Sequence, residues 1–190
     1  MAASYNFKII DDDGVILVAS ANALGAHNGW SEAPISEWLV EAMQAREMVC
    51  LGTGRSSGEA GLVRVLVQLA HRPEAESTMR ALPQLGWRTF PPLRLRLAMN
   101  DRLLVLPPSR LAQAHRDGDE FVAADRSGGT IALGVGLYDV FLGQLPEPDE
   151  SADDAGELAD RSVWFILAPA LTNAPNLVDE IWGTTPLDPH

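Results

Sequence analysis

The chain opens on Tyr5-Asn6-Phe7-Lys8-Ile9-Ile10-Asp11-Asp12-Asp13-Gly14-Val15-Ile16-Leu17-Val18-Ala19, the stretch that decides its fold class. Polar and apolar side chains alternate in residues 5–10, and a continuous apolar run follows in residues 15–19. Two short strand-like runs joined by Asp-Gly are typical of a β-hairpin. The sequence therefore predicts a hairpin at the start of a sheet that is mostly antiparallel.

The rest of the first half predicts a helix, a strand, a loop, a strand and a second helix. Ser31 and Pro34 are typical of a helix start, and apolar residues follow them at helical spacing. Residues 62–70 fit both a helix and a strand, but their β-branched and leucine side chains alternate, which favours a strand. The predicted elements are a helix at 33–46, a strand at 47–51, a Gly/Ser loop at 52–58, a strand at 62–70 and a helix at 74–82.

The second half of the chain repeats this plan. A long alternating strand is predicted at 130–143, where Gly134 and Gly136 allow a bend or bulge. The repetition predicts an α+β fold with few short helices, built from two similar halves, 5–86 and 87–145, in a single domain of residues 1–190. The other expected elements are strands at 93–99 and 103–106 joined by Asn100-Asp101-Arg102, a helical piece at 107–114, a strand at 120–124 and a loop at 126–129.

Acidic charge is concentrated in the second half. The chain has a formal net charge of −12 and a pI near 4.6. Residues 1–100 hold nine Lys/Arg and ten Asp/Glu, whereas residues 101–190 hold five and sixteen. Seven of these acids lie in a stretch poor in large apolar residues, 146–161, which predicts an exposed flexible loop. An acidic surface favours a cationic partner.

Composition also argues against several classes of function. Binding to nucleic acid or to anionic membranes needs clusters of basic residues, and this chain has a single lysine. Its longest apolar run, 163–171, is broken by Pro169 and is too short to span a membrane. The first residues lack the basic and apolar regions of a signal peptide, and Cys50 is the only cysteine. We therefore expect a cytoplasmic protein without an intrachain disulfide.

The sequence contains no convincing motif for catalysis, cofactor binding or metal binding. The Gly52–Gly58 loop misses the dinucleotide fingerprint by one residue and lacks the Walker lysine, so a plain strand connection is favoured. Asp11–Gly14 lacks the later ligands of a calcium loop and is interpreted as a turn. No serine-nucleophile elbow is present. The four histidines have no metal-binding spacing: His27, His71, His115 and His190. The expected protein has neither cofactor nor metal.

Cys50 and the tryptophans are expected to stabilise the core. The apolar neighbours of Cys50 predict a buried thiol on a strand, with a pKa at or above its ordinary value. Trp38 and Trp164 fall at core positions, whereas an indole in a connecting segment either clamps the core or anchors an interface. The three tryptophans in connecting segments are Trp30, Trp87 and Trp182. Residues 162–190 predict a last buried strand, at 162–168, and an irregular tail that Ile181-Trp182 would dock.

Several stretches, in their order along the chain, resemble bacterial polymorphic-toxin immunity proteins, and immunity protein family twenty-one in particular. They are Asp13-Gly14-Val15-Ile16-Leu17-Val18, Gly61-Leu62-Val63-Arg64-Val65-Leu66, Pro73-Glu74-Ala75-Glu76 and Asp101-Arg102-Leu103-Leu104-Val105-Leu106-Pro107. The resemblance spans about residues 5–145. The chain departs from the family pattern in having Tyr5 or Phe7 where a tryptophan is expected, and in lacking prolines after Val18.

The resemblance implies a non-enzymatic protein that binds a cognate toxin or effector domain and neutralises it. Because toxins that act on nucleic acid tend to be basic, the acidic half would suit such a partner. Two alternatives stay open: a small enzyme with a dispersed site around Gly52–Gly58, using Arg55 or His27 and His115, and a secretion-system adaptor that docks through its tail. The residues expected to bind the partner are Asp117, Asp119, Glu120, Asp125, Asp139, Asp149, Glu150, Asp153, Asp154 and Trp30.

Overall fold

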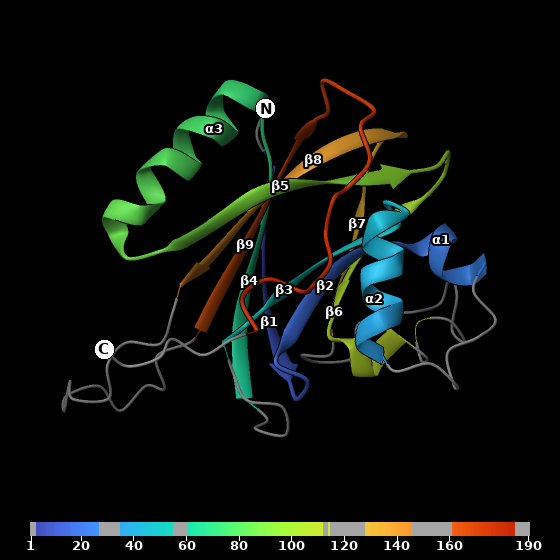
Figure 1. The fold of residues 1–190 in the computed structure, drawn as a ribbon, viewed down its shortest axis with the longest axis horizontal. Coiled ribbons are helices and arrows are strands. Elements are labelled where there is room, and N and C mark those ends of the chain that lie inside the picture. Colours follow the sequence, from blue (N-terminus) through green and yellow to red (C-terminus); the bar gives the residue numbers. More distant parts are fainter. Residues whose placement is uncertain are drawn as a thin grey trace.

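The computed structural model describes residues 3–26, 35–54, 61–111, 114, 128–145 and 161–184, and Figure 1 shows the whole chain. The described strands are β1 (Ala3–Asp11), β2 (Val15–Ser20), β3 (Met48–Gly52), β4 (Gly61–Leu69), β5 (Arg88–Leu97), β6 (Arg102–Leu106), β7 (Gly129–Ala132), β8 (Gly136–Leu145) and β9 (Arg161–Pro169). The described helices are α1 (Ala21–Ala26), α2 (Ile35–Gln44) and α3 (Arg72–Ala81), with 3-10 turns at η1 (Leu82–Leu85) and η2 (Pro108–Arg110).

The strands form two sheets that share one apolar core. The larger sheet has the order β1-β4-β9-β8-β5, and the smaller sheet has the order β3-β2-β6-β7. All neighbouring strands run antiparallel except β4 and β9, which are parallel. The prediction of an α+β fold with mostly antiparallel strands is therefore confirmed. The helix at 33–46, the strand at 62–70 and the helix at 74–82 correspond to α2, β4 and α3.

The predicted hairpin at the start of the chain is wrong, because β1 and β2 do not pair. Asp11–Gly14 is instead a corner at which the chain passes from the larger sheet to the smaller one. The two patterns in the opening stretch explain the difference. Alternating β1 lies at a sheet edge, whereas β2 is buried at all six of its residues between β3 and β6. A strand with both faces covered needs a continuous apolar run.

Two further predictions are wrong for the same reason, because the chain again passes from one sheet to the other. The strands around Asn100-Asp101-Arg102 do not form a hairpin, since β5 lies in the larger sheet and β6 in the smaller one. The single strand predicted at 130–143 is two strands, β7 and β8, which also lie in different sheets. Gly134 and Gly136 therefore mark a sheet change rather than a bulge within one strand.

The order of the strands is mirrored between the two halves of the chain. In the larger sheet the β1–β4 pair lies on one side of β9 and the β8–β5 pair on the other. In the smaller sheet β3 and β2 form one side and β6 and β7 the other, with β2 next to β6. This order is compatible with the predicted repeat of residues 5–86 and 87–145, but it does not establish a duplication. The strand predicted at 120–124, which the predicted repeat matched to β3, lies outside the described residues, and the edge opposite β3 is β7.

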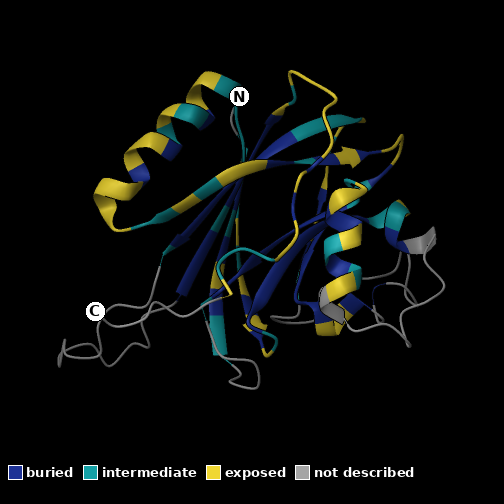
Figure 2. Ribbon diagram, in the orientation of Figure 1, coloured by how far each residue is buried: buried dark blue, intermediate teal, exposed yellow. Residues whose placement is uncertain are grey.

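Burial follows the two-sheet architecture, with buried strands at the centre and exposed residues on α2 and α3 (Figure 2). A second apolar cluster lies under α3, where Ala75 and Met79 pack on Phe141, Ile166 and Ala168 of the larger sheet. The ring centroids of Trp87 and Trp164 lie 5.8 Å apart beside this cluster, so Trp87 clamps the core, as one of its two interpretations predicted. No described helix is long and apolar enough to cross a membrane.

The short helix α1 was not predicted from the sequence. Its first N–H groups are capped from two directions. The Ser20 hydroxyl oxygen accepts a hydrogen bond from the Ala23 N–H at 3.0 Å, and the Asp101 carboxylate accepts one from the Asn22 N–H at 3.0 Å. The sequence could have indicated the Ser20 cap, which directly precedes the helix, but not the contribution of Asp101, which is remote in sequence.

Candidate partner-binding groove

Residues 170–184, which follow β9, run back across the fold without helix or strand, and we call them the C-terminal strap (red trace in Figure 1). The buried side-chain amide of Asn176 holds the strap on the outer edge of β5. It accepts a hydrogen bond from the Arg94 N–H at 2.8 Å, and it donates to the carbonyls of Arg94 at 2.9 Å and Met43 at 2.7 Å. This amide therefore satisfies backbone groups that a neighbouring strand would otherwise bind.

The end of the strap is attached to β3 and β8. The Trp182 carbonyl accepts a hydrogen bond from the Gly52 N–H at 2.7 Å, and the Gln144 amide donates to the carbonyls of Gly52 at 2.8 Å and Gly183 at 3.0 Å. The ring of Trp182 stacks on Phe90, with centroids 6.1 Å apart and planes 8° apart. These contacts confirm that the tail docks at Trp182 and show that this tryptophan clamps the strap to the core.

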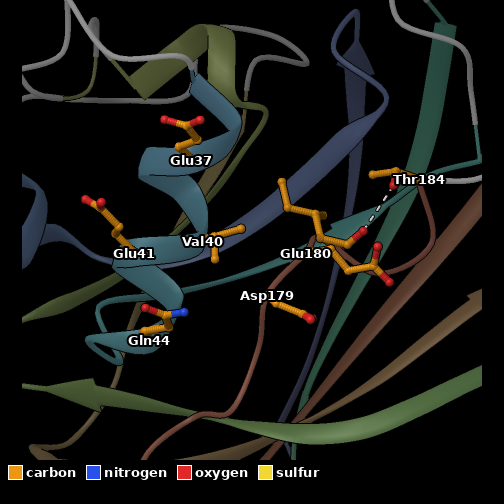
Figure 3. A pocket seen from close by; sticks show the side chains of 8 residues that line it. Glu37, Val40, Glu41, Gln44, Asp179, Glu180 and Thr184 are labelled. Carbon is orange, nitrogen blue, oxygen red and sulfur yellow. Dashed lines mark hydrogen bonds between the residues drawn. The ribbon is translucent and has the colours of Figure 1, made fainter.

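An open groove of about 570 Å³ lies between α2 and the strap (Figure 3). Val40 points from the helix toward the strap and lines the groove together with Ile181, which gives it an apolar part. At one end the Gln44 amide donates a hydrogen bond to the Val178 carbonyl at 2.8 Å. The Thr184 hydroxyl donates to the Ile181 carbonyl at 3.0 Å within the strap. The two walls are therefore tied together as well as to the core.

Four exposed carboxylates stand on the two walls of the groove. Glu37 and Glu41 come from α2, where their i, i+4 spacing places them on one face, and Asp179 and Glu180 come from the strap. Among the described residues that line the groove, none is Lys, Arg or His. Because both walls carry charge of the same sign, their fields add and attract a cation.

In Figure 3 the Glu37 and Glu41 carboxylates project from the side of α2 that is turned away from the strap, and the Asp179 and Glu180 carboxylates point away from α2, so the four groups do not converge on one point. In the described part of the chain, no three Asp, Glu, His or Cys residues lie close enough together to hold a metal ion. Calcium and magnesium sites need oxygen ligands gathered around a single ion. Separated carboxylates instead match several separated positive charges, such as those on a basic protein surface.

The groups with shifted pKa values have structural explanations. Burial raises the pKa of the Cys50 thiol, whose sulfur contacts Met48 Sδ at 3.7 Å, so the predicted buried thiol on a strand is confirmed. Burial also raises the pKa of Asp11, although the hydrogen bond from the Thr53 hydroxyl and those from three backbone N–H groups oppose this effect. Burial raises the pKa of Tyr138, whose hydroxyl donates to the Gly134 carbonyl.

Asp139 is the predicted partner-binding residue that falls within the described part of the chain. Its carboxylate is buried, forms an ion pair with Arg72 of α3 and lies 3.5 Å from Arg94 Nε of β5. The alternating pattern around it predicted an exposed face, but α3 covers that face of β8. Asp139 therefore joins α3 and β5 to the sheet, and its burial does not favour the predicted contact with a partner.

The other predicted partner-binding residues lie outside the described residues: Trp30, Asp117, Asp119, Glu120, Asp125, Asp149, Glu150, Asp153 and Asp154. The same is true of His27, Arg55 and His115, which were considered for a dispersed enzyme site. Of the Gly52–Gly58 loop, residues 52–54 are described. The Thr53 N–H donates to the Gly14 carbonyl at 2.8 Å, and both the N–H and the carbonyl of Gly52 are already hydrogen-bonded to protein groups. Its N–H is thus not available to a phosphate.

Sequence reasoning missed the four groove carboxylates. One available signal was the placement of Glu37 and Glu41 one turn apart on the predicted helix at 33–46. Another was the pair Asp179-Glu180 next to the predicted docking point Ile181-Trp182. No pattern in the sequence indicates that the tail crosses to α2. The crossing is held by side-chain amides that bind backbone carbonyls, Asn176 to Met43 and Gln44 to Val178, and single Asn and Gln residues form no recognisable motif.

No protein-family model matches this chain, and no curated protein sequence matches it. Comparison with solved structures finds similarity to the protein of crocagin biosynthetic gene J, with 14% identity, a TM-score of 0.50, and 89% of this chain aligned with 98% of that chain. ComJ from Bacillus subtilis, described as an inhibitor of the DNA degrading activity of NucA, is 10% identical with a TM-score of 0.43, covering 90% of this chain and 99% of that one. The first similarity shows a shared fold and, at that identity, nothing of function.

Proposed function

We propose that this protein is a non-catalytic inhibitor that binds a basic partner protein through the groove between α2 and the C-terminal strap. The observation that carries the proposal is the set of four exposed carboxylates on a groove that has an apolar part at Val40 and Ile181. An apolar contact surrounded by charges of one sign suits a partner that presents a hydrophobic anchor among basic residues.

The attachment of the strap supports this role. An inhibitor gains affinity when its binding surface is ordered before the partner arrives, because less conformational entropy is lost on binding. One wall of the groove belongs to α2, and the other is held by hydrogen bonds from Asn176, Gln44 and Gly52 and by the stacked Trp182 ring. The groove is therefore preorganised in the unbound protein.

The proposed partner is a toxin or effector domain that acts on nucleic acid. Proteins that bind nucleic acid neutralise phosphates with clustered Lys and Arg, so their active surfaces are basic. An acidic inhibitor is attracted to such a surface and can cover it. The resemblance of residues 5–145 to polymorphic-toxin immunity proteins leads to the same class of partner.

The test is an association measurement with the product of the neighbouring upstream gene, followed by an assay of that protein's activity. Glu41→Lys on α2 and Asp179→Lys on the strap are expected to slow association about three- to tenfold each at low salt, because they place a cation in the groove. Glu74→Lys on α3 changes the net charge equally at an exposed site remote from the groove and serves as the matched control.

Equal slowing by all three variants would mean that overall charge, and not the groove, attracts the partner. A neighbour without a toxin-like activity, together with no binding at low salt, would overturn the proposed function. Residual catalysis is tested separately, because an inhibitor should suppress the partner's activity in a one-to-one ratio and show no turnover of its own.

A further inference from the structure

A second pocket, of about 320 Å³, lies where β4 and β9 end, and we call it the sheet-end pocket. Its walls come from both sheets, because β4, β8 and β9 belong to the larger sheet and β7 to the smaller one. It shares no lining residue with the groove between α2 and the strap. The residues that define it in the argument below are Leu69, His71, Leu133, Gly134, Tyr138 and Leu167.

The walls of the sheet-end pocket are an open continuation of the main apolar core. Leu167 is buried in that core, whereas Leu69, Leu133 and Tyr138 pack against it and are half-buried. These side chains therefore keep apolar surface in contact with solvent inside a concave site. A ligand that covers such surface gains free energy from removing it from water.

The pocket also offers a hydrogen-bond acceptor. The Tyr138 hydroxyl donates to the Gly134 carbonyl at 2.8 Å, and its oxygen can still accept a hydrogen bond. Gly134 has no side chain, and a Cβ atom there would lie 3.7 Å from this oxygen, so the glycine leaves the hydroxyl accessible. The other polar side chain is His71, which stands at the N-cap of α3 and makes no capping hydrogen bond.

The lining carries no carboxylate, ammonium or guanidinium group. None of the residues that line the sheet-end pocket is Asp, Glu, Lys or Arg, although charged residues make up 21% of the chain. A charge that enters an apolar pocket without a partner loses its hydration and gains little in return. The lining therefore favours an uncharged ligand, in contrast to the acidic groove.

Size and shape restrict the ligand further. An apolar cavity of about 150 Å³ holds a benzene molecule, so the sheet-end pocket has room for one or two fused rings. Packed sheets lie about 10 Å apart, which favours a flat molecule between them. The Tyr138 ring in the wall can pack against such a molecule edge to face or offset.

We propose that the sheet-end pocket binds a small uncharged aromatic molecule of one or two rings, which donates a hydrogen bond from an N–H or O–H group to the Tyr138 hydroxyl oxygen. This site goes beyond the proposed function, because it lies outside the groove that would bind the partner protein. The two sites can therefore be tested separately.

The test is a chemical-shift titration of the full-length protein by NMR, with indole as the probe. Indole should shift the amides of Leu69, Gly134 and Tyr138 saturably, with a Kd below about 1 mM. 1-Methylindole has the same rings without the N–H and should bind about fivefold more weakly, since one hydrogen bond is lost. In Tyr138→Phe the two probes should bind equally, a result that a purely structural role of this hydroxyl would not produce.

Filling the pocket should abolish binding. Leu69→Trp enlarges a lining side chain, and Leu66→Trp makes the same change on the opposite face of β4 as the matched control. The spectrum of each variant shows whether it is folded. If Leu69→Trp does not fold, Gly134→Leu fills the pocket from an exposed residue of the corner between β7 and β8.

The absence of saturable shifts up to the solubility limit of indole would overturn the proposal. So would shifts centred elsewhere, or equal weakening by Leu66→Trp and a folded pocket-filling variant. If indole failed to bind and capture of the partner protein shifted the same amides, the pocket would receive a side chain of that partner, and the proposal of a small-molecule site would be wrong.

Discussion

At the scale of single residues, two buried aspartates hold the corners at which the chain changes sheet. One oxygen of Asp11 accepts hydrogen bonds from the N–H groups of Asp13, Gly14 and Val15, and the other accepts one from the Thr53 hydroxyl. Asp101 receives the Ser20 hydroxyl at 2.5 Å and backbone N–H groups at the second corner. At each corner the buried carboxylate accepts hydrogen bonds from backbone N–H groups that are not paired with a neighbouring strand, so these groups are not left unsatisfied.

The shifted pKa of Asp11 predicts a pH dependence of stability. Burial raises the pKa of this carboxyl above its ordinary value of 3.8 in the folded state. The contribution of Asp11 to the free energy of unfolding is therefore greatest below that value and is lost as the pH rises through the raised pKa. Asp11→Asn keeps an oxygen that can accept hydrogen bonds from the three N–H groups, but its amide does not ionise in this pH range. Relative to the wild type, this variant should gain stability as the pH rises from about 3 to about 7.

Urea unfolding of both proteins across this pH range measures the difference. Asp12→Asn removes an exposed carboxyl from the same corner and is the control, for which we expect no comparable trend. A difference between Asp11→Asn and the wild type that is constant with pH, or that shrinks as the pH rises, would show that Asp11 is not held with a raised pKa.

At the scale of elements, local patterns predicted the strands and helices but not their partners. Alternation identified β4 and the apolar run of residues 162–168 identified β9, because side-chain periodicity depends on which faces are buried. Pairing depends on contacts between distant segments, so Asp-Gly was misinterpreted as a hairpin turn although β1 and β2 belong to different sheets. The break between β7 and β8 was missed for the same reason, since a glycine pair permits a bulge and a corner equally well.

The junction of β3 with the strap gives an element-scale prediction at Gly52. A Cβ atom there would lie 2.3 Å from the carbonyl carbon of Gly183, so Gly52→Ala must displace the strap. We expect a loss of about 2 kcal/mol in unfolding free energy, as for other overpacked sites. Faster exchange of the Gly52 amide should accompany this loss, because its acceptor is the Trp182 carbonyl.

Gly134→Ala is the matched control for this substitution. The nearest atom to its added methyl group is the Tyr138 hydroxyl oxygen at 3.7 Å, an ordinary contact, so its effect should stay within about 0.5 kcal/mol. Equal effects of the two substitutions would show that the close approach of the strap to β3 does not stabilise the fold.

At the scale of the whole molecule, composition predicted that the candidate site would carry negative charge, but it did not predict where the site lies. The net charge of −12 indicated a cationic partner, and the groove between α2 and the strap carries that sign. The sequence directed attention to the densest acidic stretch, 146–161, because charge runs are visible along the chain. The groove combines two acid pairs that lie far apart in sequence, Glu37 with Glu41 and Asp179 with Glu180, and only the path of the strap brings them together.

Net charge also predicts the salt dependence of the proposed capture of a partner. The chain carries −12, and capture of a basic partner joins opposite charges, so added salt screens the attraction. The association rate should therefore fall between about 0.02 and 0.5 M NaCl. Stopped-flow association in matched buffers measures this effect. Salt that accelerates capture of the partner would contradict a charge-steered groove.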